Sequence, residues 1–462
     1  MNVCSETVAR DLCIGCGVCA GICTTGNLTM QWTPQGTLQP ADLGKCLPKC
    51  RRCLDVCPFL DHAEDEDSLG ADLFGAVPGI AHAAETGFHL RSFVGSAGAG
   101  YRERGASGGI ASYVLTSLLE RGDVDCVICV RPNHDPDRLF VYDAMADGAS
   151  VRSAARSAYY PVELSSALQM IRSEEGRYAV IALPCTVKGL RLATRADTRL
   201  RNRIAVVAGL VCGQTKGRGF TDFLVSSLGM RPSDVDRVVF RAKDTAKPAS
   251  NHLFTAVGAG GSRTTEWEGF YGRAWHSGEF SLNPCSFCDD VFAETADIVF
   301  MDAWLPEFVR DGRGTSIVLA RTPRMVDVLE DGIARGALYL KPLPIGQVIA
   351  SQSGAVTEKL AMLPYRLWLS RCAGDAPRKR VLAKRPPLLT GMRLRARERL
   401  RALSQDSAAS LRAESSLTTY VKSVRSARWR LAVILSLERR HLRLRGALRA
   451  MLGPLRQRGI GG

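Results

Sequence analysis

Between residues 90 and 345, apolar runs of strand length alternate with stretches of helical periodicity, and this alternation restricts the fold more than any other feature. The apolar runs are DCVICV (125–130), YAVIALP (178–184), IAVVAGLV (204–211), DIVFMDA (297–303) and SIVLAR (316–321). The helical patterns cover 109–121, 163–174, 217–228 and 323–335. Continuous apolar strands separated by helices predict an α/β domain, here 90–375, with a largely parallel sheet covered on both faces.

The first 60 residues are instead rich in cysteine, with one predicted hairpin in NLTMQWTPQGTLQP (27–40). CIGCGVCAGIC has the spacing C-x2-C-x2-C-x3-C, and CLPKCRRCLDVCP repeats it with one extra residue and a final proline. Such loops wrap [4Fe-4S] clusters, and the last cysteine of each run serves the other cluster. The sequence thus predicts a small ferredoxin-like domain. Its first cysteine set is Cys13, Cys16, Cys19 and Cys57, and its second cysteine set is Cys23, Cys46, Cys50 and Cys53.

The extra residue in the second run leaves alternatives open. It changes the distance between Cys46 and Cys53, so Cys46 is the ligand whose assignment is least secure. Four cysteines in one run could also form a closed tetrahedral zinc site. The basic residues Lys49, Arg51 and Arg52 would partly neutralise bound thiolates or dock an acidic electron-transfer partner; a plain solvated surface is the alternative.

A third cysteine set lies in the large domain. Cys185 and Cys212 each follow a predicted strand, at the sheet edge where open α/β folds bind ligands. The motif PCSFC adds Cys285 and Cys288, giving four thiols for a third [4Fe-4S] cluster. Cys126 and Cys129 lie within one strand, where positions three apart point to opposite faces, so we interpret them as core residues. Cys4 and Cys372 receive the same interpretation.

A glycine-rich segment, GSAGAGYRERGASGGIASYVLTSLLERG, precedes the first predicted helix of the large domain. Ser107 is a suitable N-cap, and Gly108 and Gly109 would let a phosphate approach the free N–H groups of the helix start. The pattern taken alone also fits an ordinary loop.

Charge and composition indicate the character of the linker and of the C-terminal region. Of 462 residues, those from 378 onward hold 22 Lys and Arg against 4 Asp and Glu, so the net charge of +15 belongs to the C-terminal region alone. We expect a linker at 61–89 and an Arg-rich helical tail at 376–462. No secretory signal or apolar span of about 18 residues is evident, so we expect a cytoplasmic protein. Because the cytoplasm is reducing, its sixteen cysteines are expected to be free thiols or ligands rather than disulfides. The tail could pack on the α/β domain, contact the inner face of a membrane, or bind a partner.

Several motifs, in order, resemble the family of coenzyme F420-reducing hydrogenase beta subunits and related dehydrogenases, which includes 7-hydroxymethyl chlorophyll a reductase. The matching motifs are GASGGIASYVLTSLLERG, SAYYPVELSSAL, LPCTVKGLR, GLVCGQ, NPCSFCDD and ADIVFMDAW. The resemblance implies FAD together with iron–sulfur clusters. It assigns Ser107, Gly108 and Gly109 to the FAD phosphate loop, Asp302 to the flavin surroundings, and Lys188 to a flavin or substrate contact. It also assigns the third cysteine set to a cluster. The segment TAKPASNHLF and the tail depart from the family pattern.

The function expected from these features is that of an iron–sulfur flavoprotein oxidoreductase. It would pass electrons between a redox partner, such as a ferredoxin or an oxidoreductase subunit, and an organic small-molecule substrate or deazaflavin. A link to surface-polysaccharide synthesis rests on analogy alone. The alternatives are an electron-transfer subunit without a substrate site and, less favoured, an iron–sulfur nucleic-acid-binding protein. The seven histidines show no metal-binding spacing, and no catalytic residue is assigned.

Overall fold

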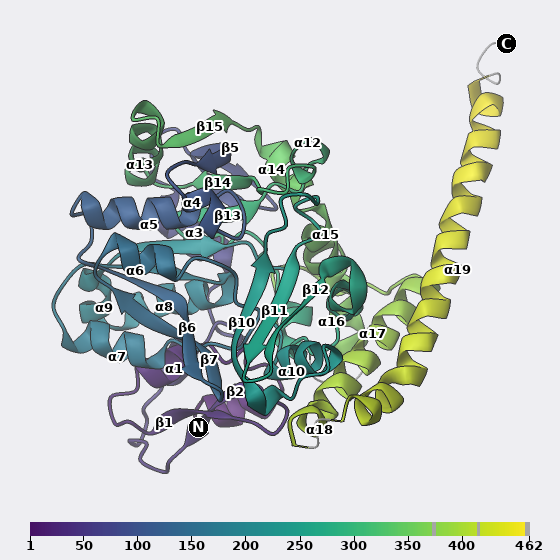
Figure 1. The fold of residues 1–462 in the computed structure, drawn as a ribbon, viewed down its shortest axis with the longest axis horizontal. Helices are drawn as coiled ribbons and strands as arrows, with labels where there is room; N and C mark the ends of the chain where they lie inside the picture. Colours follow the sequence, from purple (N-terminus) through teal and green to yellow (C-terminus); the bar gives the residue numbers. More distant parts are fainter. Residues whose placement is uncertain (372–375, 414–415, 458–462) are drawn as a thin grey trace.

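A computed structural model describes residues 1–371, 376–413 and 416–457 (Figure 1). The N-terminal region is built from short elements around its cysteines. They are the short helices η1 (Cys4–Val8), α1 (Val18–Gly21) and α2 (Arg52–Asp55), and the strands β1 (Leu28–Trp32) and β2 (Leu38–Asp42). The two strands pair antiparallel, which confirms the predicted hairpin.

An eight-stranded sheet forms the centre of the large domain, in the order β15-β5-β14-β13-β9-β8-β6-β7. The strands are β5 (Arg91–Ala97), β6 (Cys126–Asp135), β7 (Arg138–Met145), β8 (Tyr178–Ala182), β9 (Ile204–Leu210), β13 (Ile298–Asp302), β14 (Ser316–Ala320) and β15 (Leu338–Pro342). Only β6, β8, β9 and β13 run parallel to one another; all other pairs in this sheet are antiparallel. The prediction of a largely parallel sheet was therefore wrong. A tight turn joins β6 to β7, and the connection from β13 to β14 holds only the short helix α12 (Pro306–Val309), after which β14 returns antiparallel beside β13.

Helices cover both faces of this sheet, as predicted. Alternate residues of the strands enter two apolar cores: Ile128, Val180 and Val207 on one face, Val127, Ala179 and Val206 on the other. The predicted helices are confirmed to within about two residues. The helices of this region are α4 (Tyr101–Arg104), α5 (Ile110–Glu120), α6 (Gly148–Ser153), α7 (Ser165–Ser173), α8 (Pro184–Ala196), α9 (Thr198–Arg203), α10 (Arg218–Ser227), α12 (Pro306–Val309) and α13 (Pro323–Ala334).

A second, three-stranded antiparallel sheet was not predicted from the sequence. It consists of β10 (Val235–Ala242), β11 (Leu253–Gly258) and β12 (Gly261–Glu266). The short helices η2 (Pro232–Asp234), η3 (Trp267–Tyr271), α11 (Gly272–Ser277) and η4 (Asn283–Phe287) flank it. Its strands are hard to recognise because β12, GSRTTE, is polar and almost wholly exposed.

The segment 61–89, expected to be a linker, folds against the large domain. It forms α3 (Glu66–Phe74) and a small hairpin of β3 (Ala81–Ala83) and β4 (Gly87–His89). Asp65 caps α3 by accepting a hydrogen bond from the Ser68 backbone N–H at 2.9 Å. Leu69 and Phe74 are fully buried. The sequence suggested a linker because the acidic residues of this segment outnumber the few apolar ones that this helix buries.

The first part of the C-terminal helical region packs on the large domain and does not form a separate unit. The C-terminal helices are α14 (Ile345–Ser351), α15 (Ser353–Val356), η5 (Thr357–Ala361), α16 (Leu363–Arg371), α17 (Leu388–Asp406), α18 (Ala408–Ala413) and α19 (Leu417–Gln457). Tyr420 and Leu431 of α19 share an apolar core with Phe223 of α10. Beyond this contact α19 projects away from the body (Figure 1). None of the helices in the described ranges is both long enough and apolar enough to cross a bilayer.

Candidate functional site

The first cysteine set converges in the N-terminal region. Its four residues line a small cavity of about 20 Å³ between η1, α1 and α2. Burial raises the pKa of Cys16 to about 12, and the charge of Cys57 adds to this effect. The Thr7 hydroxyl lies 3.4 Å from the Cys57 sulfur, and the Gly15 backbone N–H donates to Cys13 at 3.4 Å. Cys57 thus lies with the first motif although it belongs to the second run.

The second cysteine set lies beside the first, nearer the surface. Burial raises the pKa of Cys53, and the charges of Cys46, Cys50 and Cys23 contribute. Cys46 is exposed, whereas Cys53 is buried. This grouping separates Cys57 from the other cysteines of its run, so a closed zinc site made by that run alone does not match the placement. Among the described side chains, no three His, Cys, Asp or Glu residues are close enough to bind one metal ion. A four-iron cluster is larger than an ion and spreads its thiolates further apart.

The third cysteine set is brought together from three parts of the chain. Cys185 lies at the start of α8 after β8, Cys212 follows β9, and η4 carries Cys285 just before Cys288. Burial is the main cause that raises the pKa of Cys212 to about 11. The Thr215 backbone N–H donates to the Cys285 sulfur at 3.3 Å.

Lys359, which the sequence did not single out, faces this third set. Its ammonium donates to the Cys288 sulfur at 3.1 Å and to the Asp290 carbonyl at 3.0 Å, and its side chain is 3% exposed. Burial alone would lower the pKa of Lys359, but the negative charge that Cys288, Cys212 and Cys285 carry when ionised holds it above its usual range. Four thiols, a backbone N–H group and a buried cation form a donor set that fits an anionic iron–sulfur cluster.

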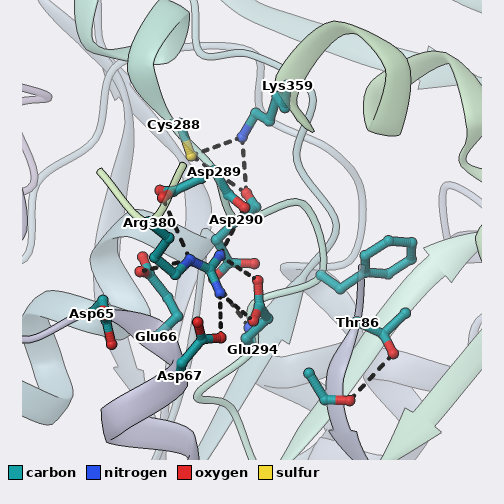
Figure 2. A network of polar contacts seen from close by, with 12 residues as sticks. Asp65, Glu66, Asp67, Thr86, Cys288, Asp289, Asp290, Glu294, Lys359 and Arg380 are labelled. Carbon is teal, nitrogen blue, oxygen red and sulfur yellow. Dashed lines mark hydrogen bonds and ion pairs between the residues drawn. The ribbon is translucent and has the colours of Figure 1, made fainter. Parts of the chain in front are cut away.

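A buried charged network extends from this third set toward the N-terminal region (Figure 2). Arg380 donates to both carboxylate oxygens of Glu294, at 2.8 and 2.9 Å, and to the Asp289 carbonyl at 2.9 Å. Lys188 pairs with Glu66 at 3.2 Å, and both side chains are 6% exposed. The positive charge of Lys188 counteracts the burial that raises the pKa of Cys57. Lys188 is therefore near both Glu66 and Cys57 of the first cysteine set.

Three of the four remaining cysteines pack as the sequence predicted. Cys126 contacts one core of the large sheet, and Cys129 belongs to the opposite core. Cys4 packs near the core of the N-terminal region, where its thiol donates to the Pro40 carbonyl at 3.2 Å. Cys372 lies outside the described residues.

A cavity of about 1110 Å³ opens at the carboxyl ends of β8, β9 and β13. Cys212 and Cys285 form part of its wall, so the third cysteine set borders it directly. Of the residues predicted to contact a cofactor, Ser107, Gly109 and Asp302 line the cavity. Lys188 and Gly108 do not occur among the described lining residues. The volume is slightly above the roughly 300–1,000 Å³ typical of ligand sites.

The glycine loop places the start of α5 at this cavity, although its details differ from the prediction. The N-cap is Gly109, with φ +78°, and no side chain caps the helix. Ser107 was expected to be the cap, but its hydroxyl donates to the Thr315 carbonyl at 2.8 Å. The Gly108 backbone N–H is likewise used, because it donates to the Ser316 hydroxyl at 2.8 Å. The loop is thereby fixed, and residues 109–112 at the uncapped helix start line the cavity.

Asp302 at the end of β13 is held by a residue that the sequence did not reveal. Arg241 donates to the two Asp302 oxygens at 2.5 and 2.6 Å, and its guanidinium lies 5.4 Å from the Trp304 ring centre. Arg241 is 6% exposed and has φ +56°, next to a register shift in β10. A non-glycine residue in the left-handed region is strained, and such strain is concentrated at functional sites. The sequence alone does not predict a positive φ at an arginine.

Aromatic and basic side chains also line the cavity. Tyr159 and Trp275 pack with ring centres 4.5 Å apart. Lys216 is 1% exposed, and burial lowers its pKa to about 7. Helix α17 contributes Arg397 and Arg401, so the C-terminal helices complete a cavity whose other walls come from the α/β domain.

Comparisons with known proteins agree with this architecture. Two family models describe the beta subunit of coenzyme F420 hydrogenase/dehydrogenase: the model of its N-terminal part matches residues 93–169, and the model of its C-terminal part matches 175–345. The F subunit of the F(420)H(2) dehydrogenase of Methanosarcina mazei is 23% identical over 219 residues, covering 45% of this chain and 55% of that protein. Coenzyme F420-dependent sulfite reductase of Methanocaldococcus jannaschii is 25% identical over 189 residues, covering 40% and 26%. The chain thus spans about half of the first relative's length and a quarter of the second's.

A solved structure shares the fold. One chain of the F420-reducing [NiFe] hydrogenase complex from Methanosarcina barkeri superimposes with a TM-score of 0.51 and 16% sequence identity. The similarity covers 65% of this chain and 99% of that chain. The two family models cover the large sheet from β5 through β15 and every element that borders the cavity before α14. The chain belongs to the family of coenzyme F420 hydrogenase/dehydrogenase beta subunits.

Proposed function

We propose that the protein is an iron–sulfur flavoprotein oxidoreductase. It would pass electrons between a one-electron partner protein and an organic substrate or deazaflavin, through three [4Fe-4S] clusters and FAD. One observation carries this proposal: the three cysteine sets follow one another from the surface of the N-terminal region to the wall of the large cavity. The family relationship supports an electron-transfer oxidoreductase of this general kind.

The order of the cysteine sets can be followed through their surroundings. The second set includes the exposed Cys46 and lies beside the first. The first and third sets then share an apolar cluster, because Cys57, Cys185 and Cys288 all pack against the same buried residues. Phe59 and Phe287 are buried members of this cluster, so apolar side chains pack against cysteines of both sets. The third set finally reaches the cavity through Cys212 and Cys285.

The cavity also fits a flavin dinucleotide. The uncapped start of α5 offers backbone N–H groups to a pyrophosphate, because a helix N-terminus carries a partial positive charge. Gly109 permits the close packing there: a Cβ at this position would lie 2.4 Å from the Tyr101 carbonyl oxygen. A bound flavin would supply the exchange between one-electron and two-electron chemistry.

The residues of this chain would position and enclose such a group. The Lys243 ammonium donates to the Ser107 carbonyl at 2.6 Å and holds the glycine loop in place. The Arg241–Asp302 pair fixes the polar wall at the end of β13. Arg397 of α17 lies on the wall contributed by the C-terminal helices. A cavity of this size supports a substrate site within the chain, rather than a subunit that only relays electrons.

The proposal is tested by anaerobic reconstitution of the full chain. We expect about twelve iron atoms per chain, four for each cluster, together with flavin absorbance. Cys288→Ser should remove the third cluster, and Cys57→Ser should damage the first, as followed by iron content and electron paramagnetic resonance. Cys126→Ser is the matched control, because this thiol packs against the sheet core. A protein that binds no flavin, or a Cys288→Ser variant with the iron content of the control, would exclude the proposal.

A further inference from the structure

The loop between β2 and α2 is the most exposed part of the N-terminal region. Residues 42–49 and 51–52 are all exposed, and the loop carries Cys46 and Cys50 of the second cysteine set. Two large apolar side chains lie open in it: Leu43 is 44% exposed and Leu47 is 57% exposed. Four basic residues surround them: Lys45, Lys49, Arg51 and Arg52. We name these six residues the cysteine-loop surface.

The positive charge of this surface is mostly free. Within the described ranges, Lys45, Lys49 and Arg51 form no ion pair, and Arg52 only approaches Asp197 at 3.9 Å. The neighbouring carboxylate of Asp42 forms hydrogen bonds within the N-terminal region. It accepts hydrogen bonds from the Asn2 side chain at 2.5 Å and from the Gly44 backbone N–H at 2.8 Å. In the described part of the chain, an incoming acidic group would therefore meet three basic side chains without an ion pair, next to the carboxylate of Asp42 and the Arg52–Asp197 pair.

We propose that the cysteine-loop surface docks an acidic one-electron carrier protein of the ferredoxin class. This inference rests on the proposed function and adds the entry point and the charge of the partner. An apolar centre with a polar rim is typical of protein–protein interfaces, whereas a nucleic-acid site would have no use for the exposed leucines. Transient redox encounters bury less than about 1,200 Å² in total, so a surface of a few side chains is enough for such a partner.

Electrostatics would act mainly on the rate of encounter. Opposite charges raise association rate constants by roughly ten- to a thousandfold at low ionic strength. Exposed charges are screened within about 10 Å at 0.1 M salt. A redox reaction through this surface should therefore be fast at low salt and slow at high salt, while the reduction of the clusters by a small chemical reductant should not depend on these side chains.

The experiment uses the reconstituted full chain and a reduced acidic [2Fe-2S] ferredoxin as the probe, mixed anaerobically in a stopped-flow instrument. The loop variant carries K45E, K49E, R51E and R52E, and a milder variant carries Gln at the same positions. The control carries K422E, R425E, R430E and R439E, which change the same amount of charge on the exposed side of α19. Dithionite reduction and iron content verify that each variant retains its clusters.

We expect the loop variant to react at least about tenfold more slowly than the wild type at low salt, and its rate to rise with salt, because its reversed charge repels the acidic probe and salt screens that repulsion. The Gln variant should lie between them, and the α19 control should react like the wild type. Equal losses in the loop variant and the control would overturn the inference, as would a wild-type protein that dithionite reduces but ferredoxin does not. Loss of DNA binding at an unchanged ferredoxin rate would also overturn it, by assigning the surface to nucleic acid. A wild-type protein with no reducible cluster would instead refute the proposed function.

Discussion

Replacing Arg380 with methionine should destabilise the fold, because this guanidinium neutralises the carboxylates between α3 and the third cysteine set (Figure 2). Its pair with Asp67 contributes little, since Asp67 is 59% exposed. Asp289 would keep a cation, because Lys379 pairs with it at 3.0 Å. The loss therefore falls on Glu294, which is 3% exposed and has Arg380 as its ion-pair partner.

The size of the effect follows from the burial of Glu294. Removing one partner of a buried ion pair costs about 3–5 kcal/mol. Burial already raises the pKa of Glu294 to about 8 despite the presence of Arg380. Glu294 is therefore mostly protonated at pH 7 even in the wild type, and without Arg380 its pKa rises further, so the loss of stability at pH 7 stays near the lower figure, about 3 kcal/mol. Above pH 8 Glu294 is ionised in the unfolded chain but stays protonated in the folded variant. The variant should therefore lose more stability than the wild type as the pH rises.

Urea unfolding of the metal-free chain at pH 7 and pH 9 measures both effects. Arg335→Met is the control, because Arg335 pairs with Asp331 at an exposed position where ion pairs contribute under about 1 kcal/mol. Adding Glu294→Gln to Arg380→Met should recover part of the loss and remove its pH dependence. An Arg380→Met variant as stable as the control, or one that Glu294→Gln does not improve, would refute this reasoning.

Three further predictions concern the cysteine sets, the core and the cavity. Lys359→Met should lower the reduction potential of the third cluster in a spectroelectrochemical titration, because the buried ammonium favours the more negative reduced state; an unchanged potential would contradict this. Burial raises the pKa of Asp222 to about 6, so the folded chain holds a proton that the unfolded chain releases near pH 4. Stability should therefore fall by about 3 kcal/mol between pH 4 and pH 6, and Asp222→Asn should abolish this fall in thermal unfolding. Gly109→Ala should weaken flavin binding in a fluorescence titration, since φ +78° and the Tyr101 carbonyl exclude a Cβ; wild-type affinity would speak against the assigned loop.

Local patterns in the sequence determined the elements and the chemical groups. The apolar runs that became β8, β9 and β13 were recognisable because a buried strand must be apolar over its whole length. The first two cysteine sets were recognisable because ligand loops need short, regular spacing. The third was inferred from two cysteines that each follow a predicted strand, together with one C-x2-C pair. The hairpin of β1 and β2 was also predictable, since its turn residues lie beside the strands that they join.

The tertiary structure alone decided how these pieces meet. The direction of β14 depends on the path of its connection, and the packing of α17 and α19 depends on apolar residues of α10 that lie about 200 positions earlier. The Arg241–Asp302, Lys359–Cys288 and Arg380–Glu294 contacts join residues 61, 71 and 86 positions apart. A buried charge selects its partner by position in space after folding, and no periodicity or spacing along the chain records that choice.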